Sequence, residues 1–297
     1  MSDGPQILID GFYCAYRSAF AFKDFRTKAG QNTGLIFGFI RTLQTIAQKW
    51  PDADMVVCWD TPSTWRREAY DGYKRNRTRS KGTTDKQQLY ATADFCRAVG
   101  IEQALSTGHE ADDVIGSMVD KSRLNIIYSR DRDFCQLVDD GVVVVYSPKT
   151  GNSPEIIFDE AAVVEKYGVH PRKLVMYRAL KGDSSDNLPG LRRFPSKKIV
   201  ALVQKHESVA DIVNTPDSSV RLTDHQKTAL AEFQQQGPLN YRLMKILTDI
   251  EVRHIPGQFD RRVALKILDD FELKSLRSTL TLFEEQGETG LMGLFDS

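Results

Sequence analysis

Carboxylates recur in this chain at the ends of predicted strands and in two short acidic runs. Three strands deliver four of them: Asp10 ends Gln6–Asp10, Asp60 ends Asp54–Asp60, and Asp131 and Asp133 follow Asn125–Ser129. The run GHEADDVIGSM adds Glu110, Asp112 and Asp113, and the run GDSSDNLPG adds Asp183 and Asp186. In each run two acids lie three residues apart, the spacing that places side chains on one helix face.

Gathered carboxylates raise one another's pKa or require cations. Oxygen ligands with little His or Cys favour Mg²⁺, for which Mn²⁺ can substitute. Nine acids exceed what one octahedral ion that keeps its waters can use, so we expect two ions. Two ions about 4 Å apart suit the hydrolysis of a phosphodiester. Each acid alone is more often a cap, a turn or a helix start, so the prediction depends on the joint pattern.

The elements that must position these acids alternate between strands and helices. The three strands named above, and a fourth at Val142–Tyr146, are continuous apolar runs typical of buried parallel strands. Helical periodicity separates them at Gly34–Lys49, Asp85–Val99 and Ala111–Lys121. We therefore predict an α/β fold with a mostly parallel central sheet flanked by helices. The strand-end acids would then meet at the carboxyl edge of that sheet.

From about Phe158 the predicted strands stop and the chain becomes helical. The expected helices are Asp159–Tyr167, Arg172–Leu180, Ser196–Lys205, Asp224–Gln235 and Leu239–Leu247, with a loop at Gln234–Gly237. We predict a catalytic domain over residues 1–160, a helical DNA-binding lobe over 161–260, and a C-terminal helix and tail over 261–297.

A basic insert, at about residues 64–88, interrupts the α/β rhythm. Its segment TWRREAYDGYKRNRTRSKGTTDK holds eight Lys or Arg and three Asp or Glu residues, and tyrosines lie between them. A charge run is usually a solvated surface. Arginines mixed with aromatic residues inside a domain instead favour contact with nucleic acid.

The overall composition excludes several other classes of protein. The formal net charge is 0, so any nucleic-acid contact must come from local patches. Four widely spaced cysteines indicate buried thiols rather than disulfides or a zinc site. No signal peptide, membrane span or Walker-type phosphate loop is evident. We expect a cytoplasmic protein, in a bacterial cell or a phage-infected host, that makes no membrane contact.

Five motifs together resemble the 5′-3′ exonuclease and flap endonuclease family, which includes the 5′ nuclease domain of bacterial DNA polymerase I and stand-alone phage 5′ nucleases. They are ILIDGFYCAYRS, VVCWD followed by WRREAYDGYKRNR, GHEADDVIGSM, SRDRDFCQLV, and KYGV with YRALKGDSSDNLPG. The family's order and spacing are kept from about Ile7 to Lys205. The resemblance implies a PIN-like nuclease domain, a basic helical arch and a helix-hairpin-helix-type lobe.

The resemblance also implies roles for individual residues. Asp10, Asp60, Glu110, Asp112 and Asp113 would surround a first ion, and Asp131, Asp133, Asp183 and Asp186 a second. Lys74 and Arg66 would face the scissile phosphate, with Asp131 among the catalytic acids, and Tyr73 would stack on a base. Further DNA contacts are expected from Arg67, Lys74, Arg75, Arg77, Arg79, Lys81, Arg192, Arg193, Lys197 and Lys198.

One departure from the family concerns the hairpin after DNLPG. This chain has Arg193 and Pro195 where the family has two glycines. In the family this hairpin holds the duplex backbone and often a potassium ion. Proline has no N–H to donate to a phosphate, so the resemblance leaves both the backbone contact and the potassium site in doubt. The added charges would replace amide contacts with ionic ones and make duplex binding more sensitive to salt.

The expected substrates are DNA with 5′ flaps or ends and RNA/DNA hybrids, cleaved with RNase H activity in primer removal during replication. The apolar C-terminal cluster at Leu291–Phe295 either packs back onto the protein or docks on a sliding clamp or single-strand-binding protein. We expect a monomeric, stand-alone nuclease. Two alternatives are a catalytically silent junction-binding protein on the same fold, and a ribonuclease that processes RNA. Retention of all nine acids disfavours the silent protein, and the helical lobe with its basic insert disfavours the ribonuclease.

Overall fold

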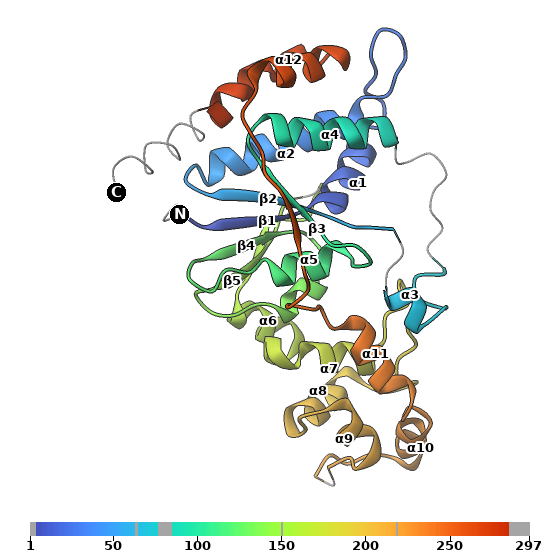
Figure 1. Ribbon diagram of the computed structural model, residues 1–297. Helices are drawn as coiled ribbons and strands as arrows, with labels where there is room; N and C mark the ends of the chain where they lie inside the picture. The colour runs from blue at the N-terminus through green and yellow to red at the C-terminus, as the bar shows by residue number, and fades with distance from the viewer. Residues whose placement is uncertain (1–3, 63–64, 77–84, 150, 218, 285–297) are drawn as a thin grey trace. The chain divides into compact units, whose positions relative to one another are not determined.

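The computed structural model describes residues 4–62, 65–76, 85–149, 151–217 and 219–284. These fall into two compact units, the first within Met1–Pro62, Arg79–Arg130 and Thr248–Ser297, the second within Ser63–Thr78 and Asp131–Leu247. Both contain helices and strands (Figure 1). No described helix is both long and apolar enough to cross a membrane.

The first unit holds five neighbouring strands of the sheet, in the order β4-β1-β2-β3-β7. Its strands are β1 (Gln6–Asp10), β2 (Asp54–Trp59), β3 (Glu102–Leu105), β4 (Asn125–Tyr128) and β7 (Arg253–Ile255). The first four run parallel and β7 pairs antiparallel to β3. The predicted strands at β1, β2 and β4 are confirmed. β3 lacks a long apolar run, and β7 contradicts the expectation that strands end near Phe158.

Helices cover both faces of this sheet, α5 on one and α2 and α4 on the other (Figure 1). The helices are α1 (Gly11–Ala21), α2 (Gly34–Lys49), α4 (Lys86–Ala98), α5 (Ala111–Ser117) and α12 (Arg261–Asp270), with a 3₁₀ turn η2 (Lys274–Thr279). The helix predicted at Gly34–Lys49 is confirmed. Its apolar positions Leu35, Ile36, Phe39, Ile40, Leu43 and Ile46 are all buried in the core. Burying each such side chain contributes about 1.5–3 kcal/mol.

The second unit is mainly helical. Its elements are α3 (Trp65–Ala69), η1 (Asp133–Gln136), β5 (Val143–Ser147), β6 (Ile156–Phe158), α6 (Glu160–Tyr167), α7 (Pro171–Lys181), α8 (Ser196–Lys205), α9 (Val209–Asn214), α10 (Asp224–Glu232) and α11 (Gln236–Met244). β5 and β6 pair antiparallel. The helix predicted at Ser196–Lys205 is confirmed to the residue, whereas α11 begins inside the predicted loop at Gln234–Gly237.

Helix starts in both units follow from local capping. Asp10 accepts a hydrogen bond from the Tyr13 N–H at 2.9 Å, and Asp85 one from the Gln87 N–H at 2.9 Å. Thr223 and Gln226 form a reciprocal capping box at the start of α10. Such caps satisfy N–H groups that the helix itself leaves unbonded, which fixes where each helix begins.

Candidate nuclease site

The carboxyl ends of β1 and β2 bring two of the predicted acids to one edge of the first unit's sheet. Asp10, 8% exposed, pairs in register with Cys58, two residues before Asp60. The Ser129 hydroxyl, just past β4, donates to Asp10 Oδ2 at 3.1 Å. The strand-edge geometry predicted from the sequence is therefore present for these two acids.

The acidic run at the start of α5 joins the same edge. The Ala111 N–H donates to Asp60 Oδ1 at 2.6 Å, so Asp60 holds the first turn of α5. Glu110 and Asp113 are 8% and 0% exposed. Buried carboxylates need polar partners or cations to remain ionised. The first unit thus gathers Asp10, Asp60 and the Glu110–Asp113 run around one end of its sheet.

The second unit holds the other four acids, also in mutual contact. The Asp133 N–H donates to Asp131 Oδ1 at 2.9 Å. Burial, reinforced by the charge of Asp131 and opposed by Arg178, raises the pKa of Asp133 to about 7. Burial also acts on Asp183, but hydrogen bonds from Ser185 and the charge of Arg178 outweigh it and lower the pKa of Asp183.

A tight loop fixes Asp183 and Asp186. Asp183 and Leu188 exchange two backbone hydrogen bonds of 2.8 Å, which close the loop. Gly182, at φ +77°, lies so close to Gly190 that a Cβ on it would come within 2.3 Å of the Gly190 nitrogen. Only glycine fits both the left-handed backbone and this approach. The GDSSDNLPG motif therefore sets the positions of its carboxylates through its two glycines.

The base of the basic insert is anchored to this acidic loop. The Lys74 N–H donates to the Asp186 carbonyl at 3.0 Å, and Asn187 Nδ2 donates to the Gly72 carbonyl at 2.9 Å. Asn76 Nδ2 donates to the Ser184 carbonyl at 2.7 Å. Lys74 has a positive φ of 55°, and its Nζ lies 4.8 Å from the centre of the Tyr73 ring. Lys74 is therefore held beside the loop that carries Asp186.

Two insert residues that are predicted to face the substrate are buried. Arg66 is 2% exposed, and its Nε and Nη2 donate to the carbonyls of Leu243 and Lys245 at 2.7 and 3.0 Å. Tyr73 is 5% exposed. In the absence of substrate, Arg66 fixes α3 near the end of α11, and Tyr73 packs in the core. The predicted contacts of Arg66 with the scissile phosphate and of Tyr73 with a base stay predictions.

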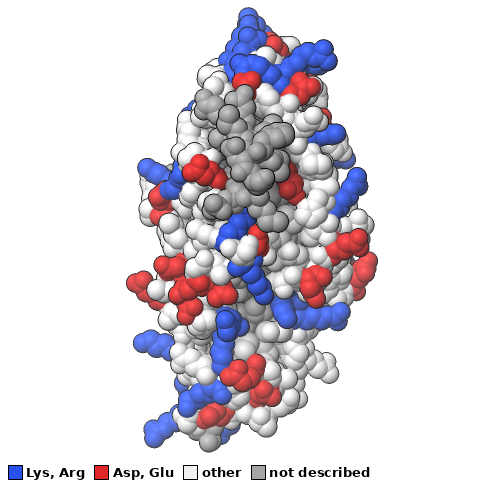
Figure 2. All heavy atoms as spheres, turned by 60° about the vertical axis from the view of Figure 1, so that its left-hand side comes forward, with Lys and Arg blue, Asp and Glu red and all other residues white. Residues whose placement is uncertain are grey.

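The predicted DNA-contacting cations divide into exposed, engaged and undescribed groups. Arg67, Arg75, Arg192, Arg193 and Lys197 are exposed, and Arg75 also pairs with Asp71 at 3.1 Å. Lys198 Nζ donates to Gln226 Oε1 at 2.9 Å and to the Arg221 carbonyl, so it helps to hold α10. Arg77, Arg79, Lys81 and the tail cluster at Leu291–Phe295 lie outside the described residues. On the face shown in Figure 2, Lys and Arg side chains alternate with Asp and Glu rather than forming a uniformly basic surface.

The hairpin that departs from the family keeps a glycine-like backbone. Arg193 has φ +52°, in the left-handed region, and Pro195 precedes α8 as its N-cap residue. The Leu191 N–H donates to the Leu180 carbonyl at 2.8 Å, which ties the hairpin to α7. The turn therefore forms without its glycines, while the exposed Arg192 and Arg193 add charge to it.

The chemistry of these residues fits hard divalent ions. Each unit offers carboxylate oxygens, several of them buried, and in the second unit burial and the neighbouring charge of Asp131 raise the pKa of Asp133. Within the described ranges, no three His, Cys, Asp or Glu side chains form a complete metal centre. The nine predicted acids are the side chains that would hold ions: Asp10, Asp60, Glu110, Asp112 and Asp113 in one unit, and Asp131, Asp133, Asp183 and Asp186 in the other.

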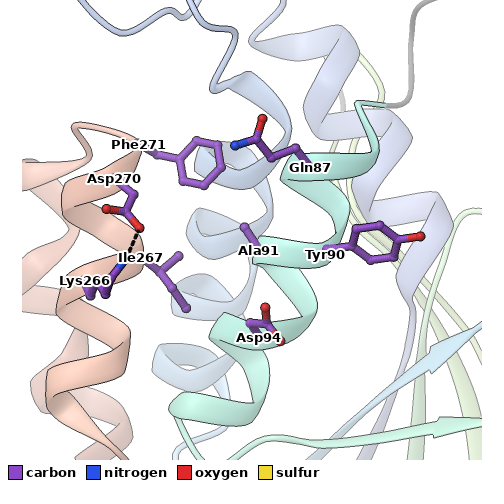
Figure 3. A pocket seen from close by; sticks show the side chains of 8 residues that line it. All are labelled: Gln87, Tyr90, Ala91, Asp94, Lys266, Ile267, Asp270 and Phe271. Carbon is purple, nitrogen blue, oxygen red and sulfur yellow. Dashed lines mark hydrogen bonds and ion pairs between the residues drawn. The ribbon is translucent and has the colours of Figure 1, made fainter.

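A separate hollow of about 580 Å³ lies between α4 and α12 (Figure 3). It is lined by Gln87, Tyr90, Ala91, Asp94, Lys266, Ile267, Asp270 and Phe271. Lys266 and Asp270 pair across one helical turn at 2.7 Å. None of the nine predicted acids lines this hollow, so we assign it no part in the carboxylate chemistry.

A resolvase-like α/β domain followed by a helical domain defines a class of nuclease, and the comparisons identify the family. Residues 5–168 match the model of the 5′-3′ exonuclease N-terminal resolvase-like domain, and residues 169–266 that of the 5′-3′ exonuclease C-terminal SAM fold. The chain belongs to the 5′-3′ exonuclease family. The predicted family and fold class are thereby confirmed, and the family is one of nucleases.

Individual relatives agree with this assignment. The chain is 32% identical to a 5′-3′ exonuclease of Aquifex aeolicus, over 82% of each chain. It is 30% identical to DNA polymerase I of Pseudomonas aeruginosa over 98% of its own length, but spans only 33% of that polymerase. The fold resembles the flap endonuclease of bacteriophage T5, solved in a pseudo-enzyme-product complex with DNA and metal ions, with a TM-score of 0.64, 17% identity, and coverage of 94% and 99%.

Proposed function

We propose that the protein hydrolyses phosphodiester bonds at 5′ flaps and 5′ ends of DNA and of RNA/DNA hybrids, using two Mg²⁺ ions. The observation that supports this most directly is the two carboxylate groups, one at the sheet edge of the first unit and one beside the glycine-closed loop of the second. When bound, divalent ions supply an activated water and stabilise charge on the leaving oxygen. The chain's own residues hold these ions and position the substrate.

Among the cations, Lys74 is the residue we propose to act on the substrate. Its backbone is fixed to the Asp186 carbonyl, and its side chain is only partly buried. A lysine so placed would neutralise charge that develops on the phosphoryl oxygens. Arg67 and Arg75 of the insert and Arg192, Arg193 and Lys197 of the hairpin would hold the DNA backbone through charge, without reading base sequence.

The biological role follows from the same substrates. We propose that the protein removes primers during replication and acts as a monomer in the cytoplasm. The tail cluster Leu291–Phe295 remains a proposed docking segment for a sliding clamp or single-strand-binding protein. Deletion of Leu291–Ser297 should abolish clamp-stimulated cleavage and leave unstimulated cleavage intact.

Cleavage of an end-labelled 5′-flap DNA tests the catalytic proposal. Wild type should release the flap in Mg²⁺ and not in EDTA. Asp131→Ala should slow cleavage at least about a hundredfold, close to 3 kcal/mol of transition-state stabilisation. Asp131 is exposed, so its loss should not unfold the chain, and the exposed Asp139→Ala serves as control. Tight flap binding without cleavage in any divalent ion would instead support the silent junction-binding protein.

A further inference from the structure

Arg178 lies between two carboxylates that the proposed function assigns to the second ion. It belongs to the last turn of α7. Its Nη2 is 2.5 Å from Asp133 Oδ1 and 2.8 Å from Asp183 Oδ2. The side chains of Arg178, Asp133 and Asp183 are 23%, 20% and 17% exposed. One guanidinium nitrogen therefore bridges two acids that are largely shielded from water.

The backbone sets this bridge. Asp133 is the first residue of η1, which packs against α7. Asp183 follows α7 after Gly182, and its loop is closed by the paired hydrogen bonds with Leu188. Exposed ion pairs between mobile side chains contribute little to stability. Here the backbones of Arg178, Asp133 and Asp183 are all fixed by packed elements. The ion-pair bridge is therefore part of the folded structure of the second unit.

The bridge also changes the charge that an incoming cation meets. A guanidinium keeps its proton at every physiological pH. Asp131, Asp133, Asp183 and Asp186 together offer up to four negative charges, and Arg178 cancels one of them. A divalent ion that binds there must displace the guanidinium or accept its repulsion at a few ångström. Like charges at such distances in a partly buried site interact strongly.

We propose that Arg178 is a positioning residue that acts as a resident counter-ion. It holds Asp133 and Asp183 in place before the second divalent ion arrives, and it weakens the binding of that ion relative to the first. This inference rests on the proposed two-ion function, and it adds the order in which the two ions bind. The first unit's acids fill at low ion concentration, and the second unit's acids fill only at higher concentration.

A titration of the full chain with Mn²⁺ tests the proposal without DNA. Free Mn²⁺ is counted by electron paramagnetic resonance for wild type, Arg178→Met and Arg172→Met. Arg172 lies on the same helix and is exposed, so its variant matches the loss of charge and of the guanidinium. We expect the dissociation constant of the weaker Mn²⁺ site to fall at least about tenfold in Arg178→Met. It should stay at the wild-type value in Arg172→Met.

A second variant guards against loss of folding. Arg178→Gln removes the charge but keeps an amide that can donate a hydrogen bond to Asp183, as Arg178 does. Both Arg178 variants should unfold at lower temperature than wild type in EDTA, because two carboxylates lose their cation. Both should gain more thermal stability from Mn²⁺ than wild type does.

The outcomes separate this inference from the function on which it rests. Wild type that binds Mn²⁺, together with Arg178 variants that bind the weaker ion no more tightly, would overturn the counter-ion role alone. Wild type that binds no Mn²⁺ at all would overturn the two-ion function and the inference together. Tighter Mn²⁺ binding in Arg172→Met as well would reduce the effect to general charge and also overturn the specific role of Arg178.

Discussion

At the scale of single residues, burial decides what a charged side chain can do. Arg66 and Arg67 are neighbours in α3 with the same chemistry, yet Arg66 is 2% exposed and Arg67 is exposed. The Arg66 guanidinium donates to two backbone carbonyls of the same unit. Loss of this charged donor leaves the buried Leu243 carbonyl without its Arg66 partner, which lowers the stability of the fold.

We therefore predict that Arg66→Met lowers the free energy of unfolding by about 2–4 kcal/mol. Arg67→Met should change it by less than about 0.5 kcal/mol. Chemical denaturation of both variants measures the difference. Cleavage of flap DNA by Arg66→Met, below its melting temperature, tests the predicted phosphate contact. A large loss of rate while the variant stays folded would support that contact, and a rate close to that of wild type would exclude it.

The residues that the sequence identified correctly are those whose type is unusual in their setting. A carboxylate at the end of a buried apolar strand stands out, so Asp10 and Asp60 were placed correctly at the sheet edge. An arginine within a helix does not stand out, so no sequence pattern marks Arg178. Its role depends on the approach of η1 and the Asp183 loop, which no periodicity encodes.

At the scale of elements, strands with continuous apolar runs were predictable and the short, polar strands β3 and β7 were not. β1 and α8 match their predicted bounds. β3 has only four residues, two of them polar, and β7 reads Arg-His-Ile with both polar residues exposed. Each of these strands forms because the strand beside it supplies hydrogen bonds. Their own side chains do not show the apolar pattern that identifies a strand in a sequence. Such tertiary pairing is absent from a local sequence pattern.

In the hairpin between α7 and α8, the effect of backbone conformation on stability can be measured separately from the effect of charge on DNA binding. Arg193 holds φ +52°, a conformation that costs a non-glycine residue about 1–2 kcal/mol. Arg193→Gly should fold with stability close to wild type, since relief of that cost offsets the flexibility of glycine. Arg193→Val should lose about 1–2 kcal/mol, because a branched side chain fits the left-handed region poorly.

Both variants lose the same charge, so DNA binding should respond alike. The slope of log affinity against log salt for a 5′-flap duplex should fall by about 0.9 in each. Fluorescence anisotropy across a salt series measures the slope, and thermal unfolding measures the stability. Unchanged slopes would remove Arg193 from the DNA interface, whereas equal stability of the two variants would contradict a backbone constraint at this turn.

At the scale of the whole molecule, zero net charge does not oppose the binding of nucleic acid. Lys and Arg alternate with Asp and Glu on the face seen in Figure 2. Long-range attraction of DNA should therefore be weak, and contacts must come from local groups such as the insert and the hairpin. Family membership was predictable because five motifs keep their order, whereas composition alone gave no hint of a nuclease.

The reactivity of the four cysteines measures whether both units are folded, because the cysteines are distributed over both units and all are buried. Burial raises the pKa of Cys135 to about 11, and it also raises the pKa of the other three thiols. Only the thiolate reacts with disulfide reagents. At pH 8 the native protein should therefore react at least about a hundredfold more slowly than the denatured chain, which should release four equivalents.

The same shifts make stability depend on pH in one direction. A thiol ionises near pH 8.5 in the unfolded chain and only at higher pH in the native one. The native state thus keeps its protons longer, and its stability should fall as pH rises above about 8.5. Reaction with a chromogenic disulfide, followed across a denaturant series at pH 8, should track global unfolding. A thiol that reacts rapidly in the absence of denaturant would show that one unit opens locally, and mapping of the labelled cysteine would identify which.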